Sequence, residues 1–155
     1  MKKFLVLMLL FASSAFALDG KITKAHDGDS FYVTGVTQEI RVRYADTPEF
    51  KAFTWGNQPF AAKAREDMLK LCGGQVVTLT KMTLDKRTNR YMANVSCQGQ
   101  DLATYLINNG DAWAYRFTST KATRALQASA KAKGVGLWAL PNPIEPYLWR
   151  KNGMH

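Results

Sequence analysis

The order of strand-like and helical segments most limits what this chain can fold into. Short segments that are rich in β-branched and aromatic residues, or that alternate between polar and apolar ones, occupy residues 21–25, 30–36 and 39–44. Such patterns indicate half-buried β-strands. One helix is predicted next, and two more strand-like segments follow at residues 75–84 and 90–97. We therefore predict a small domain that is built mainly on β-sheet.

Turn-forming residues separate these segments. Residues 26–29 (His-Asp-Gly-Asp) predict a turn, and Pro48 ends the third strand region because proline cannot donate to a strand ladder. The predicted helix runs over residues 59–71, with proline in its first turn and Gly73 after its end. Residues 85–89 join the last two strands as a hairpin.

The C-terminal third is predicted to be helical. Asp101 suits the N-cap of a helix that ends near Gly110, and a second helix is predicted over residues 121–133. We interpret residues 137–150 as an extended strap that packs on the body of the domain. The core is expected to include Trp113, Trp138 and Trp149.

Five short strands with one helix between the third and the fourth follow the order of an OB-fold barrel. We predict an α+β, mainly β fold: a five-stranded OB-fold barrel with three helices, formed by residues 18–155 as one domain. Barrels of this kind commonly bind oligonucleotides on one face. The fold alone does not establish a function.

Residues 1–17 predict a signal peptide. Two lysines precede a short apolar run, and Ala15-Phe16-Ala17 provides a small-residue cleavage site. An uncleaved membrane anchor is the alternative, but the apolar run is short for a membrane span. We expect cleavage after Ala17, export to the periplasm or the medium, and no stable membrane association afterwards. The mature chain is expected to be a monomer.

The charge of the chain limits its partners. It carries 21 Lys and Arg residues against 12 Asp and Glu residues, which gives a formal net charge of +9. A basic exported domain favours polyanions such as nucleic acid, anionic lipid or acidic glycans. Charge by itself does not distinguish these partners from a role in solubility.

Cys72 and Cys97 form the only cysteine pair in the sequence. Exported proteins can join such a pair in a disulfide. The predicted hairpin brings both residues toward the same end of the sheet, which favours the bridge. Two free buried thiols are the alternative.

Acidic and basic side chains recur where the predicted strands begin and end. Asp29 closes the first turn, Asp46 and Glu49 follow the third strand, Arg41 lies on that strand, and Arg90 opens the fifth. Carboxylate oxygens are ligands that Ca²⁺ prefers, and planar guanidinium groups suit phosphate oxygens. Each short motif is weak when taken alone, since an Asp-Gly pair usually marks only a turn.

Five segments together resemble the staphylococcal-nuclease-like (thermonuclease) family over nearly the whole chain after residue 17. They are HDGDS, IRVRYADTPE, NRYMANV, GVGLW and PNPIEPYLWR. The resemblance implies an OB-fold nuclease that binds one Ca²⁺ ion. It also implies hydrolysis of DNA and RNA by water attack at phosphorus, which leaves a 5′-hydroxyl and a 3′-phosphate.

The resemblance also implies roles for single residues. Asp29 and Asp46 match the metal-binding carboxylates, and Thr47 matches a backbone carbonyl ligand of the metal. Arg41 and Arg90 match the two arginines that hold the scissile phosphate. Glu49 matches a proposed general base, a role that can also be indirect.

Two of these matches leave alternatives open. The family usually has Tyr-Gly where Thr88-Asn89 stands here, so Arg87 is an alternative to Arg90. Asn tolerates the left-handed backbone that Gly supplies. Tyr115 and Phe117 lie where the family places aromatic residues of the base pocket, with ordinary core packing as the alternative.

His26 could be interpreted as a base, but we interpret it as an exposed turn histidine. A noncatalytic OB-fold module that binds nucleic acid and a basic surface-interaction protein are the competing functions. The chain keeps all the carboxylates and arginines, which favours the nuclease. Single strands are the expected substrate, because the phosphate must reach deep between Arg41 and Arg90.

Overall fold

The computed structural model describes residues 16–50 and 56–152. Residues 1–15 of the predicted signal peptide lie outside the described residues, and so do residues 51–55 of the loop after the third strand. Within the described parts, no helix has both the length and the apolar character needed to cross a membrane.

Six strands form one sheet in the order β3-β2-β1-β5-β6-β7, and a parallel pairing of β3 with β6 closes the first five into a barrel. A separate pair consists of β4 and β8. The predicted mainly β, OB-fold architecture is thereby confirmed. The strands are β1 Leu18–Ala25, β2 Ser30–Val33, β3 Ile40–Val42, β4 Ala45–Asp46, β5 Val76–Asp85, β6 Arg90–Cys97, β7 Gln100–Asp101 and β8 Trp113–Ala114.

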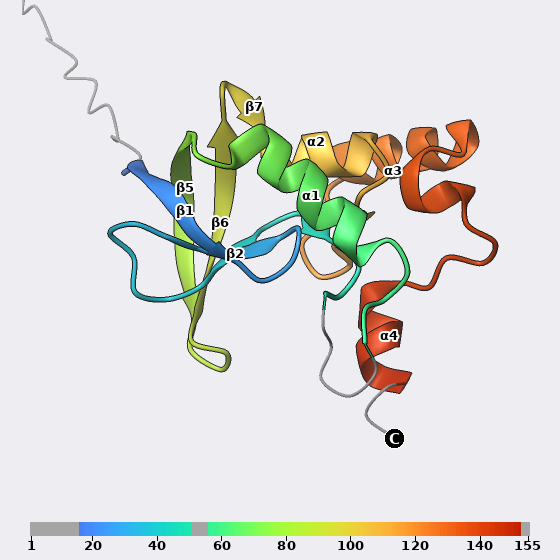
Figure 1. Ribbon diagram of the computed structural model, residues 1–155, viewed down its shortest axis with the longest axis horizontal. Helices are drawn as coiled ribbons and strands as arrows, with labels where there is room; N and C mark the ends of the chain where they lie inside the picture. The colour runs from blue at the N-terminus through green and yellow to red at the C-terminus, as the bar shows by residue number, and fades with distance from the viewer. Residues whose placement is uncertain (1–15, 51–55, 153–155) are drawn as a thin grey trace, which may run out of the picture.

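The helices gather on one side of the barrel, with α1 against α2 and α2 against α3, whereas α4 stands apart from them (Figure 1). Helix α2 also packs on β6. The helices are α1 Ala61–Cys72, α2 Leu102–Asn108, α3 Lys121–Lys133 and α4 Pro146–Asn152, with a 3-10 turn η1 at Gly136–Ala139.

Local capping explains where two helices start. The Asp101 side chain accepts a hydrogen bond from the backbone N–H of Thr104 at 2.8 Å, as predicted for an N-cap. Thr120 and Thr123 form a reciprocal capping box at the start of α3. Gly134 ends that helix in a left-handed conformation with φ of 61°.

The main core fills the barrel and the helix interface. Its largest fully buried side chains are Phe31, Ile40, Met68, Leu79, Leu102, Leu106 and Ile107. A second, smaller cluster holds Trp113 and Trp138, whose ring centroids are 4.4 Å apart. Both belong to the packed interior as predicted, whereas Trp149 is half-buried on α4 and lies in neither described cluster.

The tail corrects one expectation, because it is not a continuous extended strap. It forms η1 and then α4, so the domain has a fourth helix beyond the three predicted. Pro146 occupies the first position of α4, where its fixed φ suits a helix and its missing N–H costs nothing. A hydrogen bond from the Leu137 N–H to the Gly110 carbonyl, at 2.8 Å, ties the start of this tail to the end of α2.

The Cys72 and Cys97 thiols are joined in a disulfide, with a Cα–Cα distance of 5.4 Å. The bond links the end of α1 to the end of β6, and both residues are buried.

Candidate active site

Strand pairing places Asp29 next to Arg41. Asp29 comes directly before β2, and the register pairs Ser30 with Arg41 across β2 and β3. The Val42 N–H donates to the Asp29 carbonyl at 2.8 Å, and the Asp29 N–H donates to the Asp27 carboxylate at 3.1 Å. These backbone contacts hold Asp29 in a completely buried position.

Gly28 is needed for the close packing of this turn. A Cβ atom at residue 28 would lie 2.8 Å from Cγ2 of Thr47 and 3.1 Å from the carbonyl oxygen of Ala64. Only glycine therefore lets the turn approach both the Thr47 loop and α1. The Asp-Gly-Asp sequence forms a turn, and its glycine is also required for the close packing of that turn.

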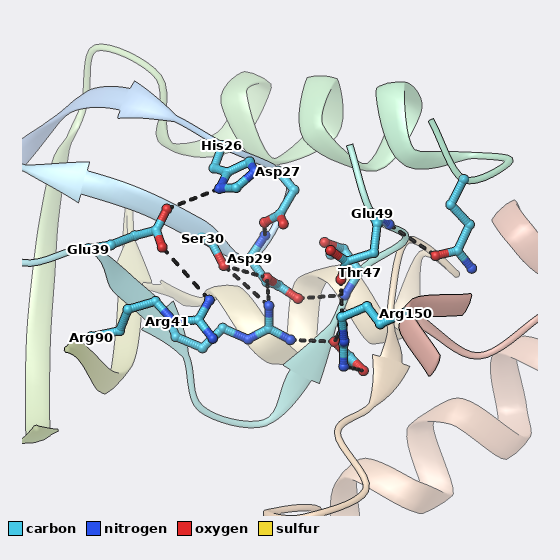
Figure 2. Close-up of polar contacts among 12 residues, drawn as sticks. His26, Asp27, Asp29, Ser30, Glu39, Arg41, Thr47, Glu49, Arg90 and Arg150 are labelled. Atoms are coloured by element: carbon cyan, nitrogen blue, oxygen red, sulfur yellow. Dashed lines mark hydrogen bonds and ion pairs between the residues drawn. The ribbon is translucent and has the colours of Figure 1, made fainter. Parts of the chain in front are cut away.

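Arg41 joins the two predicted metal-binding carboxylates. Its Nη1 donates to Oδ1 of Asp29 at 2.6 Å and to Oγ of Ser30 at 3.2 Å, and its Nη2 donates to Oδ1 of Asp46 (Figure 2). The side chain is only 8% exposed. Burial disfavours the charged guanidinium, but Asp29 and Asp46 outweigh that effect and hold the pKa of Arg41 above its usual value.

The segment after β3 supplies the second half of the site. Asp46 is fixed by pairing with Trp113 across β4 and β8. The Thr47 N–H donates to Oδ2 of Asp29 at 2.6 Å, which links the two acidic turns directly. The Glu49 N–H donates to Oε1 of Gln58 at 3.0 Å. Four residues that sequence analysis places in one site, Asp29, Arg41, Asp46 and Thr47, are therefore in contact.

The centre holds more acidic than basic groups. Burial raises the pKa of Asp27 well above its usual value, and the neighbouring Asp29 raises it further. Burial also raises the pKa of Glu49, although Arg150 opposes that shift. The carboxyl groups are those of Asp27, Asp29, Asp46 and Glu49, and the guanidinium groups among them are those of Arg41 and Arg150.

The oxygen atoms available at this centre fit a hard divalent cation that is held by two protein carboxylates. Among the described residues, no three His, Cys, Asp or Glu side chains are grouped to hold a metal ion. Asp29 and Asp46 nevertheless lie on the same guanidinium, with Asp29 on Nη1 and Asp46 on Nη2 of Arg41. Ca²⁺ accepts carboxylate, backbone carbonyl and water oxygens in flexible geometry, so two carboxylates can suffice when other oxygens complete the shell.

A groove of about 610 Å³ opens beside this centre. Three of its arginines, Arg41, Arg90 and Arg150, come from β3, β6 and α4. The groove is lined by Arg41, Glu49, Arg87, Thr88, Arg90, Tyr115, Phe117, Tyr147, Arg150 and Lys151.

Arg90 and Arg87 both line the groove but differ in how they are held. Arg90 lies 3.7 Å from the Glu39 carboxylate and is 34% exposed, whereas Arg87 is 85% exposed and lies 3.9 Å from Asp85. Asn89 adopts a left-handed φ of 52°, as expected for a residue that replaces Gly at this turn. The geometry favours Arg90 as the fixed cation of the pair.

Three other predicted residues are also placed. His26 is 56% exposed, and its Nδ1 lies 3.3 Å from the same Glu39 carboxylate. Tyr115 and Phe117 stack edge to face at 5.4 Å on the groove wall and are absent from the described core clusters. The Arg41 guanidinium lies 5.3 Å from the Tyr115 ring centroid. The structure therefore places both aromatic residues at the groove and His26 at the surface.

Sequence reasoning gives no role to two residues that the structure places at the centre. Arg150 contacts Asp46 and Glu49, and the buried Gln58 holds the Glu49 backbone. Neither belongs to a motif whose spacing indicates such a contact.

The fold and the site together define the class of this protein. It is a closed OB-fold barrel that carries a buried cluster of acidic and basic side chains at the edge of a cationic groove. The staphylococcal nuclease homologue family matches residues 39–140. The chain belongs to this family.

Relatives of known name agree with that assignment. A Haemophilus influenzae protein described as an uncharacterized endonuclease is 33% identical over 95% of this chain and 81% of its own length. The Escherichia coli protein ParB is 31% identical over 93% of this chain and 86% of its own length. The Arabidopsis thaliana staphylococcal-like nuclease CAN1 is 32% identical over 73% of this chain, a match that covers 33% of the plant protein.

Proposed function

We propose that the protein is a Ca²⁺-dependent nuclease that hydrolyses phosphodiester bonds in DNA and RNA and leaves 3′-phosphate products. Membership of the family and the relatives named as nucleases support a nuclease. The observation that carries the rest is the bridge that Arg41 makes between Asp29 and Asp46. It holds two carboxylates, whose oxygens suit a hard divalent ion, in contact with a guanidinium, which suits a phosphate.

In the proposed site, Asp29 and Asp46 hold the ion together with the Thr47 carbonyl. A bound divalent ion polarises a phosphoryl oxygen and lowers the cost of the charge that develops there. Arg41, buried against both carboxylates, is preorganised to donate to the same phosphate.

Glu49 and Arg90 complete the proposed chemistry. Glu49 is held at the groove by the contact of its backbone with Gln58, and its carboxylate can orient the attacking water or accept its proton. Arg90, positioned by Glu39, offers a second guanidinium to the equatorial oxygens of the phosphate.

The groove supports single-stranded nucleic acid as the substrate. The rings of Tyr115 and Phe117 offer faces on which an unpaired base can stack without sequence preference. Nothing in the groove lining is specific for a 2′-hydroxyl, which is consistent with cleavage of both DNA and RNA. Equal rates on single-stranded and double-stranded DNA would contradict this part of the proposal.

We also propose that the protein is exported and acts as a monomer. The signal-like residues 1–17 support export, and the Cys72–Cys97 disulfide suits an oxidising compartment. Asp29, Arg41, Asp46 and Arg150 contact one another within one chain, which supports a monomer as the active form. N-terminal sequencing of protein from the cell envelope or medium tests the export, and sedimentation analysis tests the monomer.

The central test is cleavage of a labelled single-stranded oligonucleotide during a Ca²⁺ titration, with end-group analysis of the products. We expect cleavage that requires Ca²⁺, stops in chelator and leaves 3′-phosphate ends. Asp46→Asn should abolish it, whereas Asp19→Asn, an exposed carboxylate on β1, should not. Oligonucleotide binding without cleavage at any Ca²⁺ concentration would instead favour a noncatalytic binding module.

A further inference from the structure

The C-terminal helix places an arginine on the carboxylates of the site. Nη1 of Arg150 lies 3.2 Å from Oδ1 of Asp46, and Nη2 lies 3.3 Å from Oδ2, so the guanidinium faces both oxygens of that carboxylate. Nη1 also donates to Oε1 of Glu49, and both residues are labelled in Figure 2. Arg150 is thereby in contact with two of the residues assigned to the proposed reaction.

The position of α4 is fixed by contacts outside the carboxylate cluster. Nε2 of the buried Gln58 donates to the Ile144 carbonyl at 2.7 Å, while its Oε1 accepts from the Glu49 N–H. One amide therefore holds both the Glu49 loop and the segment that leads into α4. Nε of Arg116 donates to Glu145 at 2.8 Å just before the helix.

The aromatic wall of the groove continues onto the same helix. The Arg116 guanidinium lies 4.2 Å from the Tyr147 ring centroid, and Phe117 stacks edge to face on Tyr147 at 5.8 Å. These contacts, together with those of Gln58, hold the helix from several directions. The placement of Arg150 is thus a property of the fold.

Exposure separates Arg150 from Arg41. Both arginines line the groove, but the Arg41 side chain is only 8% exposed, whereas the Arg150 side chain is 33% exposed. An arginine that served only to neutralise Asp46 would not need to face the groove. A guanidinium at this place can exchange a carboxylate for a phosphate, because both acceptors offer paired oxygens to its planar fork.

We propose that Arg150 is a third substrate-binding guanidinium of the active site, which α4 delivers to the phosphate beside Arg41 and Arg90. The inference rests on the proposed nuclease function. The incoming phosphate would offer the Arg150 guanidinium paired oxygens in place of those of Asp46. The C-terminal helix is then part of the substrate site and not only of the scaffold.

The test uses a nucleoside 3′-monophosphate, which holds no phosphodiester bond to cut. Its dissociation constant is measured by calorimetry at saturating Ca²⁺ for the full chain, Arg150→Ala, Arg150→Lys and the control Lys133→Ala. Lys133 is an exposed cation at the end of α3 and does not line the groove. Thermal melting of each variant checks that it folds.

We expect Arg150→Ala to weaken nucleotide binding about tenfold, as is typical for the loss of a hydrogen bond to a charged group. Arg150→Lys should recover only part of this loss, because an ammonium cannot form the paired contact. Lys133→Ala should bind like the wild type. If Arg150→Ala fails to fold, the nucleotide affinity of Arg150→Lys is compared with that of the wild type instead. Weaker binding by Arg150→Lys then supports the inference, and equal binding overturns it.

Two results would overturn the inference. The first is nucleotide binding by Arg150→Ala that equals the wild type. The second is tighter Ca²⁺ binding and faster cleavage by Arg150→Ala, which would mean that Arg150 blocks the metal ligands in the wild type. Either result, with cleavage by the wild type intact, refutes the role of Arg150 alone, whereas a wild type that does not cleave with Ca²⁺ refutes the proposed function itself.

Discussion

Arg41 and Asp29 form a buried ion pair across β2 and β3, with Nη1 of Arg41 2.6 Å from Oδ1 of Asp29 and side-chain exposures of 8% and 0%. The second terminal nitrogen of the same guanidinium reaches Asp46. One side chain therefore neutralises two buried acids and faces the groove where a phosphate would bind. Stability and catalysis depend on the same group.

Replacing Arg41 should reveal both roles. Arg41→Ala leaves the buried Asp29 without its cation and Asp46 with Arg150 alone, so we expect the free energy of unfolding to fall by about 3–5 kcal/mol. Arg41→Lys keeps the charge and should restore part of that stability. It should still lower kcat/KM about 10²-fold or more, because one ammonium cannot replace a fork of preorganised donors.

Urea unfolding and steady-state cleavage of an oligonucleotide measure these two effects. Arg124→Ala serves as the control, since Arg124 lies on α3 and contacts Ser119 outside the groove. If Arg41→Lys kept the kcat/KM of the wild type, cleavage would not depend on the forked geometry of the guanidinium.

The disulfide should matter for stability and not for chemistry. Cys72 and Cys97 close a loop with a sequence separation of 25, and neither residue lines the groove. Cross-linking a loop of this length is worth about 3 kcal/mol by the loop-entropy estimate. We expect the Cys72→Ser/Cys97→Ser double variant to lose that amount in urea unfolding and to keep its cleavage rate at low temperature.

A reducing agent provides the matched comparison for the disulfide. It should lower the stability of the wild type toward that of the double variant and leave the double variant unchanged. Equal stability of oxidised and reduced wild type would show that the bridge contributes nothing to the folded state.

The barrel can be predicted from the sequence because its strands and turns are marked by patterns of neighbouring residues. Alternation over residues 39–44 and the hairpin signal at residues 85–89 correspond to β3 and to the turn between β5 and β6. Helix ends also follow from single residues, as at Asp101 and Gly73. Each of these features depends on neighbours a few positions away.

The assembly of the site can be predicted only in part from such local patterns. The contact of Asp29 with Arg41 follows from an adjacent strand pair, but no local pattern places Arg150 on Asp46 across a separation of 104 residues. That contact depends on how α4 docks through Gln58. The tail was wrongly predicted as extended for the same reason, because a helix of seven residues is marginal without its tertiary contacts.

Arg90 and Arg87 are the two alternatives that the sequence leaves open for the phosphate contact. Arg90 is half-exposed and positioned by Glu39, whereas Arg87 is 85% exposed on the hairpin. We expect Arg90→Ala to lower kcat/KM about 10²-fold, in the range for loss of one preorganised donor. Arg87→Ala should lower it only severalfold through weaker electrostatic attraction. The reverse order of the two effects would assign the phosphate contact to Arg87.

Asp111 should make stability depend on pH. It is 1% exposed, and its Oδ2 has no hydrogen-bond partner among the described residues. Burial, followed by the neighbouring Asp67 carboxylate, raises the pKa of Asp111 to about 7, although Lys63 and Lys70 oppose the shift. In the unfolded chain an Asp titrates near pH 4, at about 3.9.

The sign of the effect follows from the protons bound in each state. Between these two pKa values the folded protein holds a proton on Asp111 that the unfolded chain has released, so the free energy of unfolding falls as the pH rises. The loss begins near pH 4, ends near pH 7 and is on the order of 4 kcal/mol at most. Above pH 7 both states carry the charge, and this contribution stays constant.

Asp111→Asn removes the titrating group and keeps the shape of the side chain. We expect the variant to be more stable than the wild type at pH 8, with the difference shrinking toward pH 4.5 in urea unfolding. Acids outside this cluster, such as Glu49, affect both proteins equally, so the difference between the two curves reports Asp111 together with its neighbour Asp67. Parallel curves for Asp111→Asn and the wild type would mean that Asp111 stays ionised in the folded protein, paired with a cation such as Lys63.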